Sequence, residues 1–274
     1  MPTGSSTTQK SIGQSFAQLR GRGIGLVPFI PAGYPDLPTT AALLKELDGV
    51  GVSAIEIGFP FSDPIADGPT IQQAFTAALS HHLKVSDIFR SVASVSREVS
   101  SPLVAMVSFS IVFRYGPERF FSDARDAGFS AILIPDLPPP QAEKTCQLVR
   151  KASLDTILLV APTTTEQRRK EIIKLTSGFV YYLSFSGITG ARDQLPHDIS
   201  QNVQDLKSMT DLPICVGFGI SKPRHLVELA QFADGAVVGS ALVRTLSDSL
   251  SSGPLGTAKA VGQYCRTLLA NSHS

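Results

Sequence analysis

Three carboxylates lie close together in one early stretch of the chain, and one of them interrupts an apolar segment. Residues Ala54–Gln72 read A-I-E-I-G-F-P-F-S-D-P-I-A-D-G-P-T-I-Q, with Glu56 between two isoleucines. This alternation predicts a short strand whose isoleucines face one side while the glutamate faces the other. A carboxylate on a buried side costs free energy unless it is paired or used. A salt-bridged glutamate at a sheet edge is the alternative, but Asp63 and Asp67 in the following loop favour a functional site.

Acid–base chemistry is what such a cluster can perform. Glu56, partly desolvated in its strand, is expected to have a raised pKa and to move protons. Asp67, in a polar loop, is expected to stay ionised. Two carboxylates in different environments would then take different roles. Asp63 lies between Ser62 and Pro64, where it is expected to cap its own turn.

The chain around this cluster alternates between strands and helices. Several apolar runs lack a polar face, which is typical of strands in a parallel sheet that helices cover. Short β-branched or apolar runs predict strands at Gly25–Ile30, Ala54–Gly58, Leu103–Ser108, Ala131–Pro135, Thr156–Val160, Phe179–Ser184, Ile214–Gly217 and Gly235–Gly239.

Helical patterns fill several of the intervals between these strands. A helix after Pro38 is expected to be capped by Thr39 or Thr40. Further helices are predicted between Gly116 and Gly128, at Thr165–Leu175, and from Pro223 to about Phe232.

A strand–helix unit repeated eight times over about 250 residues predicts a single α/β domain, a (β/α)8 TIM barrel. The doubly wound open sheet is the alternative, but the strands are too many and no G-x-G-x-x-G follows the first one. An amphipathic segment at Ile12–Leu19 is expected to form an extra N-terminal helix that closes the bottom of the barrel. We therefore expect an N-terminal segment with its helix at 1–22 and a catalytic barrel domain at 23–274.

The composition argues against several classes of protein. A net charge of +1 gives no basic surface for nucleic acid. No apolar run approaches the roughly 20 residues of a membrane span, and the N-terminus lacks an apolar signal core. Cys146, Cys215 and Cys265 are far apart and are expected to be reduced, which fits a cytoplasmic protein. The five histidines offer no ligand spacing, so we expect neither a metal nor an organic cofactor.

Barrel enzymes carry their sites in the loops after the strands, and glycine-bearing loops follow the last three predicted strands. They read S-G-I-T-G at Ser186–Gly190, G-F-G-I-S at Gly217–Ser221 and G-S at Gly239–Ser240. Glycines let backbone N–H groups approach an anion, and a helix N-terminus behind them adds a favourable dipole. Simple turn chemistry is the alternative for each glycine taken alone. Their joint position predicts a phosphate site that is built from backbone amides and Ser240.

At this point several segments resemble one family. E-I-G-F-P-F-S-D-P-I-A-D-G-P-T-I-Q is highly similar to the signature of the tryptophan synthase alpha chain. G-F-V-Y-Y-L-S with the following G-I-T-G-A, V-G-F-G-I-S-K-P and G-A-V-V-G-S-A-L-V resemble that family too. The resemblance covers about Gly23 to Leu246, nearly the whole chain.

The resemblance implies a (β/α)8 barrel that cleaves indole-3-glycerol phosphate to indole and glyceraldehyde 3-phosphate in tryptophan biosynthesis. It also implies a partner, a pyridoxal-phosphate-dependent beta chain that receives the indole within an alpha2–beta2 complex. Glu56 takes the position of the proton shuttle and Asp67 the position that stabilises the indole N–H. The phosphate-binding positions fall on Gly190, Phe218, Gly219, Gly239 and Ser240. The indole-pocket positions fall on Phe29, Met106, Leu133, Tyr181 and Val237.

Several loops depart from the family pattern. Many relatives carry a tyrosine and an Asn-Pro or Asn-Leu pair where this chain has Ser108, Ser110 and Ile111. Bacterial relatives often carry arginine where this chain has Phe185. Because such loops face the substrate or the beta chain, three functions stay open. The chain is an alpha chain that works with a beta chain, a free-standing indole-3-glycerol-phosphate lyase, or a mainly regulatory alpha-like subunit. A phosphosugar isomerase on the same barrel is a more distant fourth, since a fold alone does not set a function.

Overall fold

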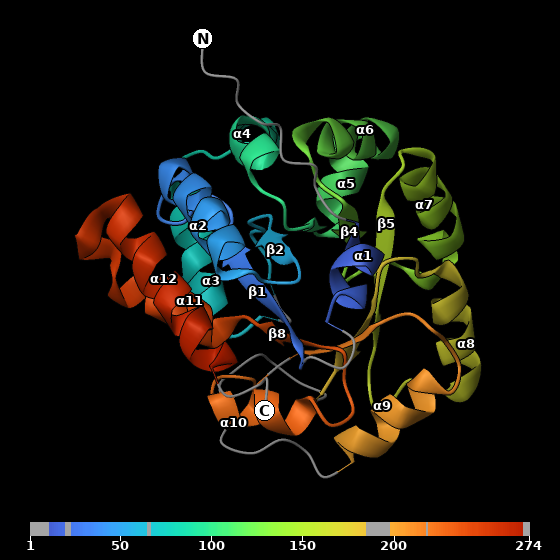
Figure 1. Ribbon diagram of the computed structural model, residues 1–274. Helices are drawn as coiled ribbons and strands as arrows, with labels where there is room; N and C mark the ends of the chain where they lie inside the picture. The colour runs from blue at the N-terminus through green and yellow to red at the C-terminus, as the bar shows by residue number, and fades with distance from the viewer. Residues whose placement is uncertain (1–10, 20–22, 65–66, 185–197, 218, 271–274) are drawn as a thin grey trace.

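Eight parallel strands close into a barrel, which confirms the predicted fold (Figure 1). The computed structural model describes residues 11–19, 23–64, 67–184, 198–217 and 219–270. The strands pair in sequence order, and the last one pairs with the first. They are β1 (Gly25–Pro31), β2 (Ile55–Gly58), β3 (Leu103–Met106), β4 (Ala131–Leu133), β5 (Asp155–Val160), β6 (Val180–Leu183), β7 (Ile214–Gly217) and β8 (Gly235–Val238).

Helices follow every strand and form a layer around the barrel (Figure 1). The short helix α1 (Ile12–Ala17) precedes the first strand. The outer helices are α2 (Leu37–Val50), α3 (Pro69–Ser80), α4 (Val85–Val95), α5 (Phe109–Tyr115), α6 (Pro117–Ala127), α7 (Pro139–Lys151), α8 (Glu166–Leu175), α9 (Ile199–Lys207), α10 (Pro223–Leu229), α11 (Ser240–Asp248) and α12 (Gly253–Leu269).

The start of α2 differs from the prediction. Neither Thr39 nor Thr40 caps this helix, because the N-cap is Asp36, whose side chain accepts a hydrogen bond from the Thr39 N–H at 2.7 Å. Aspartate is as strong an N-cap as serine, and Pro38 fits inside the first turn, where its missing N–H is not needed. The prediction treated the proline as preceding the helix, although it belongs to it.

Other predicted boundaries were close. The helix between Gly116 and Gly128 is confirmed, as is the helix capped by Thr165. The helix from Pro223 ends earlier, at Leu229, and β3 and β4 each end two residues before the predicted position. These strand tails instead enter the loops that line the mouth of the barrel.

The side chains of β2 alternate as predicted. Ile55 and Ile57 belong to the core between strands and helices, whereas the neighbouring Ala54 belongs to the cluster inside the barrel. Glu56 lies on that interior side, in register with Phe29 of β1 and Val104 of β3. Burial of the two isoleucines therefore holds the glutamate side chain inside the barrel.

Helix α1 closes the end of the barrel where the strands begin. Ile12 and Phe16 are buried in the interior cluster, and the Phe16 ring packs edge-on against Phe179 at 5.9 Å between ring centroids. A Cβ on Gly25 or Gly235 would come within 2.7 and 2.9 Å of the Phe16 ring. The sequence therefore needs glycine at both strand starts to admit this aromatic side chain. The division into 1–22 and 23–274 stays a prediction.

Two further features concern membrane spans and cysteines. No helix in the described ranges is long and apolar enough to cross a membrane. All three cysteines are buried and carry free thiols.

Asp48 fastens the end of α2 to the segment before β3. One oxygen of its carboxylate accepts four hydrogen bonds, from the backbone and hydroxyl groups of Ser100 and Ser101, at 2.7–3.0 Å. Burial alone would raise the pKa of Asp48, but these hydrogen bonds outweigh burial and lower the pKa below its usual value.

Replacing Asp48 by alanine is expected to lower the free energy of unfolding by about 2 kcal/mol, because four donors lose their acceptor. Asp48→Asn keeps an acceptor oxygen but loses the charge, so about 1 kcal/mol is expected. Since the folded-state pKa is depressed, the stability from the charge is present above the unfolded-state pKa and is lost as pH falls through the folded-state pKa. Urea unfolding from about pH 7 to about pH 2 should show wild type and Asp48→Asn converging. A gap that persists at acid pH would contradict this account.

Candidate active site

The Glu56 carboxyl group is buried inside the barrel. Its side chain lies among apolar strand residues, and the residue is only 2% exposed. Within the described residues, Glu56 Oε2 has no hydrogen-bond partner. A buried polar atom without a partner costs free energy, so a fold retains it where the group has a chemical use.

The surroundings of Glu56 strongly favour its protonated form. Burial, and then the charge of Asp67, raise the pKa of Glu56 to about 8. The hydroxyl of buried Tyr181 responds to the same charges, because burial first and then Glu56 raise its pKa well above the usual value. At neutral pH Glu56 therefore holds a proton that it can donate, and Tyr181 keeps its own.

Asp67 lies in the loop between β2 and α3. Gln72 in the first turn of α3 holds this loop, because its side-chain amide donates to the carbonyl oxygens of Asp67 and Pro64 at 2.7 and 3.2 Å. Burial raises the pKa of the half-buried Asp67 carboxylate to about 6. The pKa of Asp67 stays below that of Glu56, which agrees with the expectation that Asp67 is ionised. Asp67 is ionised at neutral pH while Glu56 is not.

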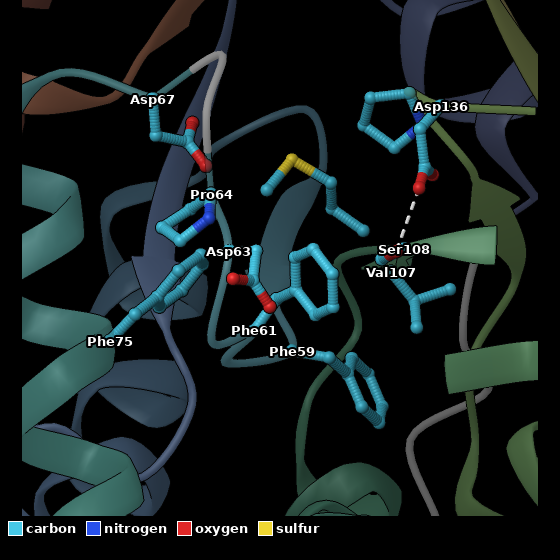
Figure 2. A pocket seen from close by; sticks show the side chains of 11 residues that line it. Phe59, Phe61, Asp63, Pro64, Asp67, Phe75, Val107, Ser108 and Asp136 are labelled. Atoms are coloured by element: carbon cyan, nitrogen blue, oxygen red, sulfur yellow. Dashed lines mark hydrogen bonds between the residues drawn. The ribbon is translucent and has the colours of Figure 1, made fainter. Parts of the chain in front are cut away.

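A cavity of about 350 Å³ opens beside Asp67 at the ends of β2, β3 and β4. Figure 2 shows Asp63, Asp67 and Phe75 along one side, with Ser108 and Asp136 across from them. The lining is mainly apolar, and carboxylates occupy its rim. It consists of Phe59, Phe61, Asp63, Pro64, Asp67, Phe75, Met106, Val107, Ser108, Pro135 and Asp136.

Asp136 ties the loops after β3 and β4 together. Its carboxylate accepts from the Ser108 hydroxyl and from the Phe109 N–H, both at 2.7 Å. The Ser108 hydroxyl also caps α5 by accepting from the Ser110 N–H at 3.3 Å. On the facing rim, the Ser62 hydroxyl donates to Asp63 at 2.6 Å. That Asp63 caps its own turn stays a prediction, and the residue also lines the cavity.

A cluster of aromatic rings packs against Phe59, which lines the cavity. Phe59 contacts the rings of Phe89, Phe120 and Phe129 with centroids 5.5, 5.6 and 5.9 Å apart. Tilted and edge-on pairs of this kind restrict one another's rotation. The cavity shape is thus set by packing that reaches out to α4 and α6.

The predicted indole-pocket residues lie in two apolar clusters that Met106 joins. Leu133, Tyr181 and Val237 belong to the cluster inside the barrel, and Met106 packs against it. Phe29 lies in an adjoining cluster that Met106 also contacts, and its ring packs edge-on against Phe75 at 6.3 Å between centroids. Met106 is the member of this set that lines the cavity.

The predicted phosphate positions are partly visible. Gly219 follows β7 with a φ of +79°, a left-handed conformation that favours glycine. Gly239 precedes α11, and Ser240 is its first residue. Gly190 and Phe218 lie outside the described residues. The Ser221 N–H, also placed in this site from the sequence, donates instead to His225.

Several cavity residues were not predicted to take part in the site. Phe75 was missed because α3 was not recognised as a helix. The signal for it was present, since Ile71, Phe75 and Ala78 follow Pro69 at helical spacing and all three are buried. Phe61, Val107 and Asp136 carry no comparable signal, because they converge only when three separate loops meet.

A closed barrel with two carboxyl groups of raised pKa, one inside β2 and one in the loop that follows it, is typical of a class of protein, the barrel enzymes that use acid–base chemistry. The profile of the family described as Tryptophan synthase alpha chain matches residues 16–270. The chain belongs to the tryptophan synthase alpha chain family, and it is therefore a lyase of tryptophan biosynthesis.

Individual relatives agree with this assignment. The tryptophan synthase alpha chain of Rippkaea orientalis is 40% identical over 260 residues, which cover 94% of this chain and 96% of the relative. That of Geotalea daltonii is 43% identical over 234 residues, or 85% of this chain and 89% of the relative.

Solved structures show the same similarity. A mutant tryptophan synthase alpha-subunit from Pyrococcus furiosus superposes with a TM-score of 0.83 at 34% identity, covering 91% of this chain and 99% of that one. The structure of Mycobacterium tuberculosis tryptophan synthase gives a TM-score of 0.83 at 34% identity, covering 96% of this chain and 99% of that one.

The raised pKa of Glu56 should make the free energy of unfolding depend on pH. Because its folded-state pKa is raised, Glu56 contributes stability below its unfolded-state pKa, and this is lost as pH rises through about 8. Glu56→Gln, which never ionises, is therefore expected to become more stable than wild type at high pH, by on the order of 4 kcal/mol near pH 9. Urea unfolding between about pH 5 and pH 9 measures this difference.

Glu98→Gln supplies the matched control, because Glu98 makes an exposed ion pair with Lys45. Such pairs contribute little to stability, so this variant should follow wild type at each pH. Parallel curves for Glu56→Gln and Glu98→Gln would show that Glu56 is not a desolvated acid.

Proposed function

We propose that this chain cleaves indole-3-glycerol phosphate to indole and glyceraldehyde 3-phosphate, with Glu56 as the proton shuttle and Asp67 as the group that stabilises the indole N–H. The observation that carries the proposal is the buried carboxyl group of Glu56, whose Oε2 has no hydrogen-bond partner among the described residues and whose pKa is raised to about 8. A group with this pKa is protonated at neutral pH yet gives up its proton readily, as an acid that must later act as a base requires.

The first step breaks the aromaticity of the indole ring. The Glu56 carboxylic acid protonates indole C3, which leaves the positive charge on the ring nitrogen and the carboxylate on Glu56. Asp67, ionised because its pKa of about 6 lies below neutral pH, accepts a hydrogen bond from the ring N–H and stabilises that charge. The two carboxyl groups thus take different protonation states for different roles.

The second step cleaves the carbon–carbon bond. The Glu56 carboxylate removes the proton from the glycerol hydroxyl next to C3, and the oxygen forms the aldehyde carbonyl. The electrons of the broken bond restore the indole ring and neutralise its nitrogen. Glu56 regains its proton and no other reactant is consumed, so this scheme uses neither a metal nor an organic cofactor.

The substrate would span the mouth of the barrel. The aromatic end would lie among the apolar positions that the family resemblance implies, of which Met106 lines the same cavity as Asp67; they are Phe29, Met106, Leu133, Tyr181 and Val237. The phosphate would then lie toward β7 and β8, at Gly219, Gly239 and Ser240, with Gly190 and Phe218 contributing from outside the described residues. A phosphate bound at the N-terminus of α11 gains from the helix dipole.

The beta chain of an alpha2–beta2 complex is the proposed partner. Family membership supports it, and one surface feature suits it. Phe113 on α5 is 71% exposed, and its ring lies tilted against that of Phe109, which follows the cavity-lining Ser108. Exposed aromatic residues are common anchors in protein interfaces. We place this complex in the cytoplasm, which the three free thiols favour.

Two alternatives retain the same chemistry or the same partner. A free-standing lyase would release indole quickly without a beta chain, whereas a mainly regulatory subunit would bind the beta chain and cleave poorly. The raised pKa of Glu56 and the ionised Asp67 favour an active site over the regulatory alternative.

Removing either carboxyl group should abolish most of the cleavage. Glu56→Gln is expected to lower kcat by roughly 100- to 10,000-fold, because no group can then shuttle the proton. Asp67→Asn should lower kcat by roughly 100- to 1,000-fold through loss of the stabilising charge. Indole release from indole-3-glycerol phosphate measures both, with Glu98→Gln as the control. A near-normal rate for either variant would remove that residue from the catalytic pair.

The aromatic face of α5 can be tested separately from the chemistry. Addition of a beta chain is expected to raise indole release, and Phe113→Ser should weaken this stimulation by about tenfold while basal turnover is unchanged. Leu255→Ser is the control, since Leu255 is 73% exposed but lies on α12. Fast basal turnover that no beta chain alters would favour the free-standing lyase, and stimulation that survives Phe113→Ser would place the interface elsewhere.

A further inference from the structure

The loop after β7 is held from two sides at one residue, Ser221. The Ser221 backbone N–H donates to the His225 imidazole Nδ1 at 3.2 Å. The Tyr264 hydroxyl from α12 donates to the Ser221 carbonyl oxygen at 2.9 Å. Both backbone groups of this residue are thereby bound to side chains, one from α10 and one from a helix distant in sequence.

His225 is an unusual residue for this place. It is 1% exposed and lies in the first turn of α10, next to the buried core residue Leu226. Its Nδ1 accepts a hydrogen bond from the Ser221 N–H. A polar ring costs free energy in such an environment unless its atoms are bonded, and the Ser221 N–H supplies one of these bonds.

Tyr264 in the outer helix α12 binds the carbonyl oxygen of Ser221. Burial raises the pKa of Tyr264 to about 12, so its hydroxyl keeps the proton that it donates. The residue lies on α12, which packs against α10. The position of the loop is therefore set by two helices at once.

The same loop carries one of the proposed phosphate positions. Gly219, with its φ of +79°, lies two residues before Ser221, and the intervening Ile220 is buried in the core. Because the Ser221 N–H is already bonded, it is turned to His225 instead of the substrate. The position of Gly219, and of the backbone amide that it would offer to phosphate, then depends on how Ser221 is fixed.

We infer that His225 is a positioning residue for the phosphate end of the substrate, acting through the Ser221 backbone without touching the substrate itself. This inference rests on the proposed function, because it assumes that Gly219 belongs to the phosphate site. Loss of the Nδ1 acceptor frees the Ser221 N–H and loosens the loop. Phosphate binding weakens, while Glu56 and Asp67 stay in place. KM rises and kcat is preserved, which is the mark of lost uniform binding.

Two substitutions separate the acceptor from the bulk of the ring. Asn and Leu branch at the same atom and have similar size, but only Asn places an oxygen acceptor where Nδ1 lies. His225→Leu is expected to raise KM for indole-3-glycerol phosphate by roughly five- to tenfold, the value of one hydrogen bond, with kcat within about twofold of wild type. His225→Asn should restore KM to within about twofold of wild type.

Binding of inorganic phosphate, measured by calorimetry on the whole chain, reads the same effect without turnover. Its Kd should rise in His225→Leu and recover in His225→Asn. Tyr264→Phe, which removes only the hydroxyl, should shift KM in the same direction and serves as the test if His225→Leu does not fold. Equal KM and Kd for the Asn and Leu variants would refute the role of the acceptor, as would a fall in kcat at constant KM.

The failure of this inference differs from the failure of the proposed function. Wild-type chain that binds phosphate but releases no indole, with or without a beta chain, would refute the proposed cleavage. Phosphate binding that is the same in wild type and both His225 variants would refute the positioning role, whatever the turnover.

Discussion

Exclusion of water from the Glu56 carboxyl group is the constraint on which the rest of the site depends. A glutamate in solution would be ionised at neutral pH and could not begin a reaction that needs an acid. The barrel interior reverses this, because two outward-facing isoleucines hold the side chain inward and the surrounding strands remove it from solvent. The fold therefore bears a local cost in stability to keep one proton available.

The loops around the mouth follow a common pattern. In each case a side chain bonds to a backbone group of the segment that must be held. Gln72 binds the carbonyl of Asp67, Asp136 binds the N–H of Phe109, and His225 binds the N–H of Ser221. Each such bond needs only one polar side chain, so the strand residues remain available for apolar packing. They turn loops, which are usually the most mobile segments, into extensions of the rigid barrel.

The strands, and the burial of a carboxylate on β2, could be predicted from sequence because both are local signals, whereas the catalytic roles of Glu56 and Asp67 stay predictions. A buried parallel strand is a short apolar run, and Glu56 interrupts one. The cap of α2 was assigned wrongly because Asp36 precedes a proline that was taken to lie outside the helix. The cavity could not be predicted, since Phe61, Val107 and Asp136 come from different loops and meet only in the closed barrel. The raised pKa of Asp67 was missed for the same reason, because its burial is produced by neighbours distant in the chain.

The seating of Phe16 between Gly25 and Gly235 gives the N-terminus a part in the chemistry at the opposite mouth. Helix α1 belongs to the same packed interior, because Ile12 and Phe16 share a buried cluster with Ala54 and with Val104, the register partner of Glu56. We expect that drawing α1 away would open this cluster to water and lower the pKa of Glu56, since burial is the main cause of its elevation. Both carboxyl groups would then stay in the chain, but Glu56 would no longer hold the proton that the proposed reaction uses.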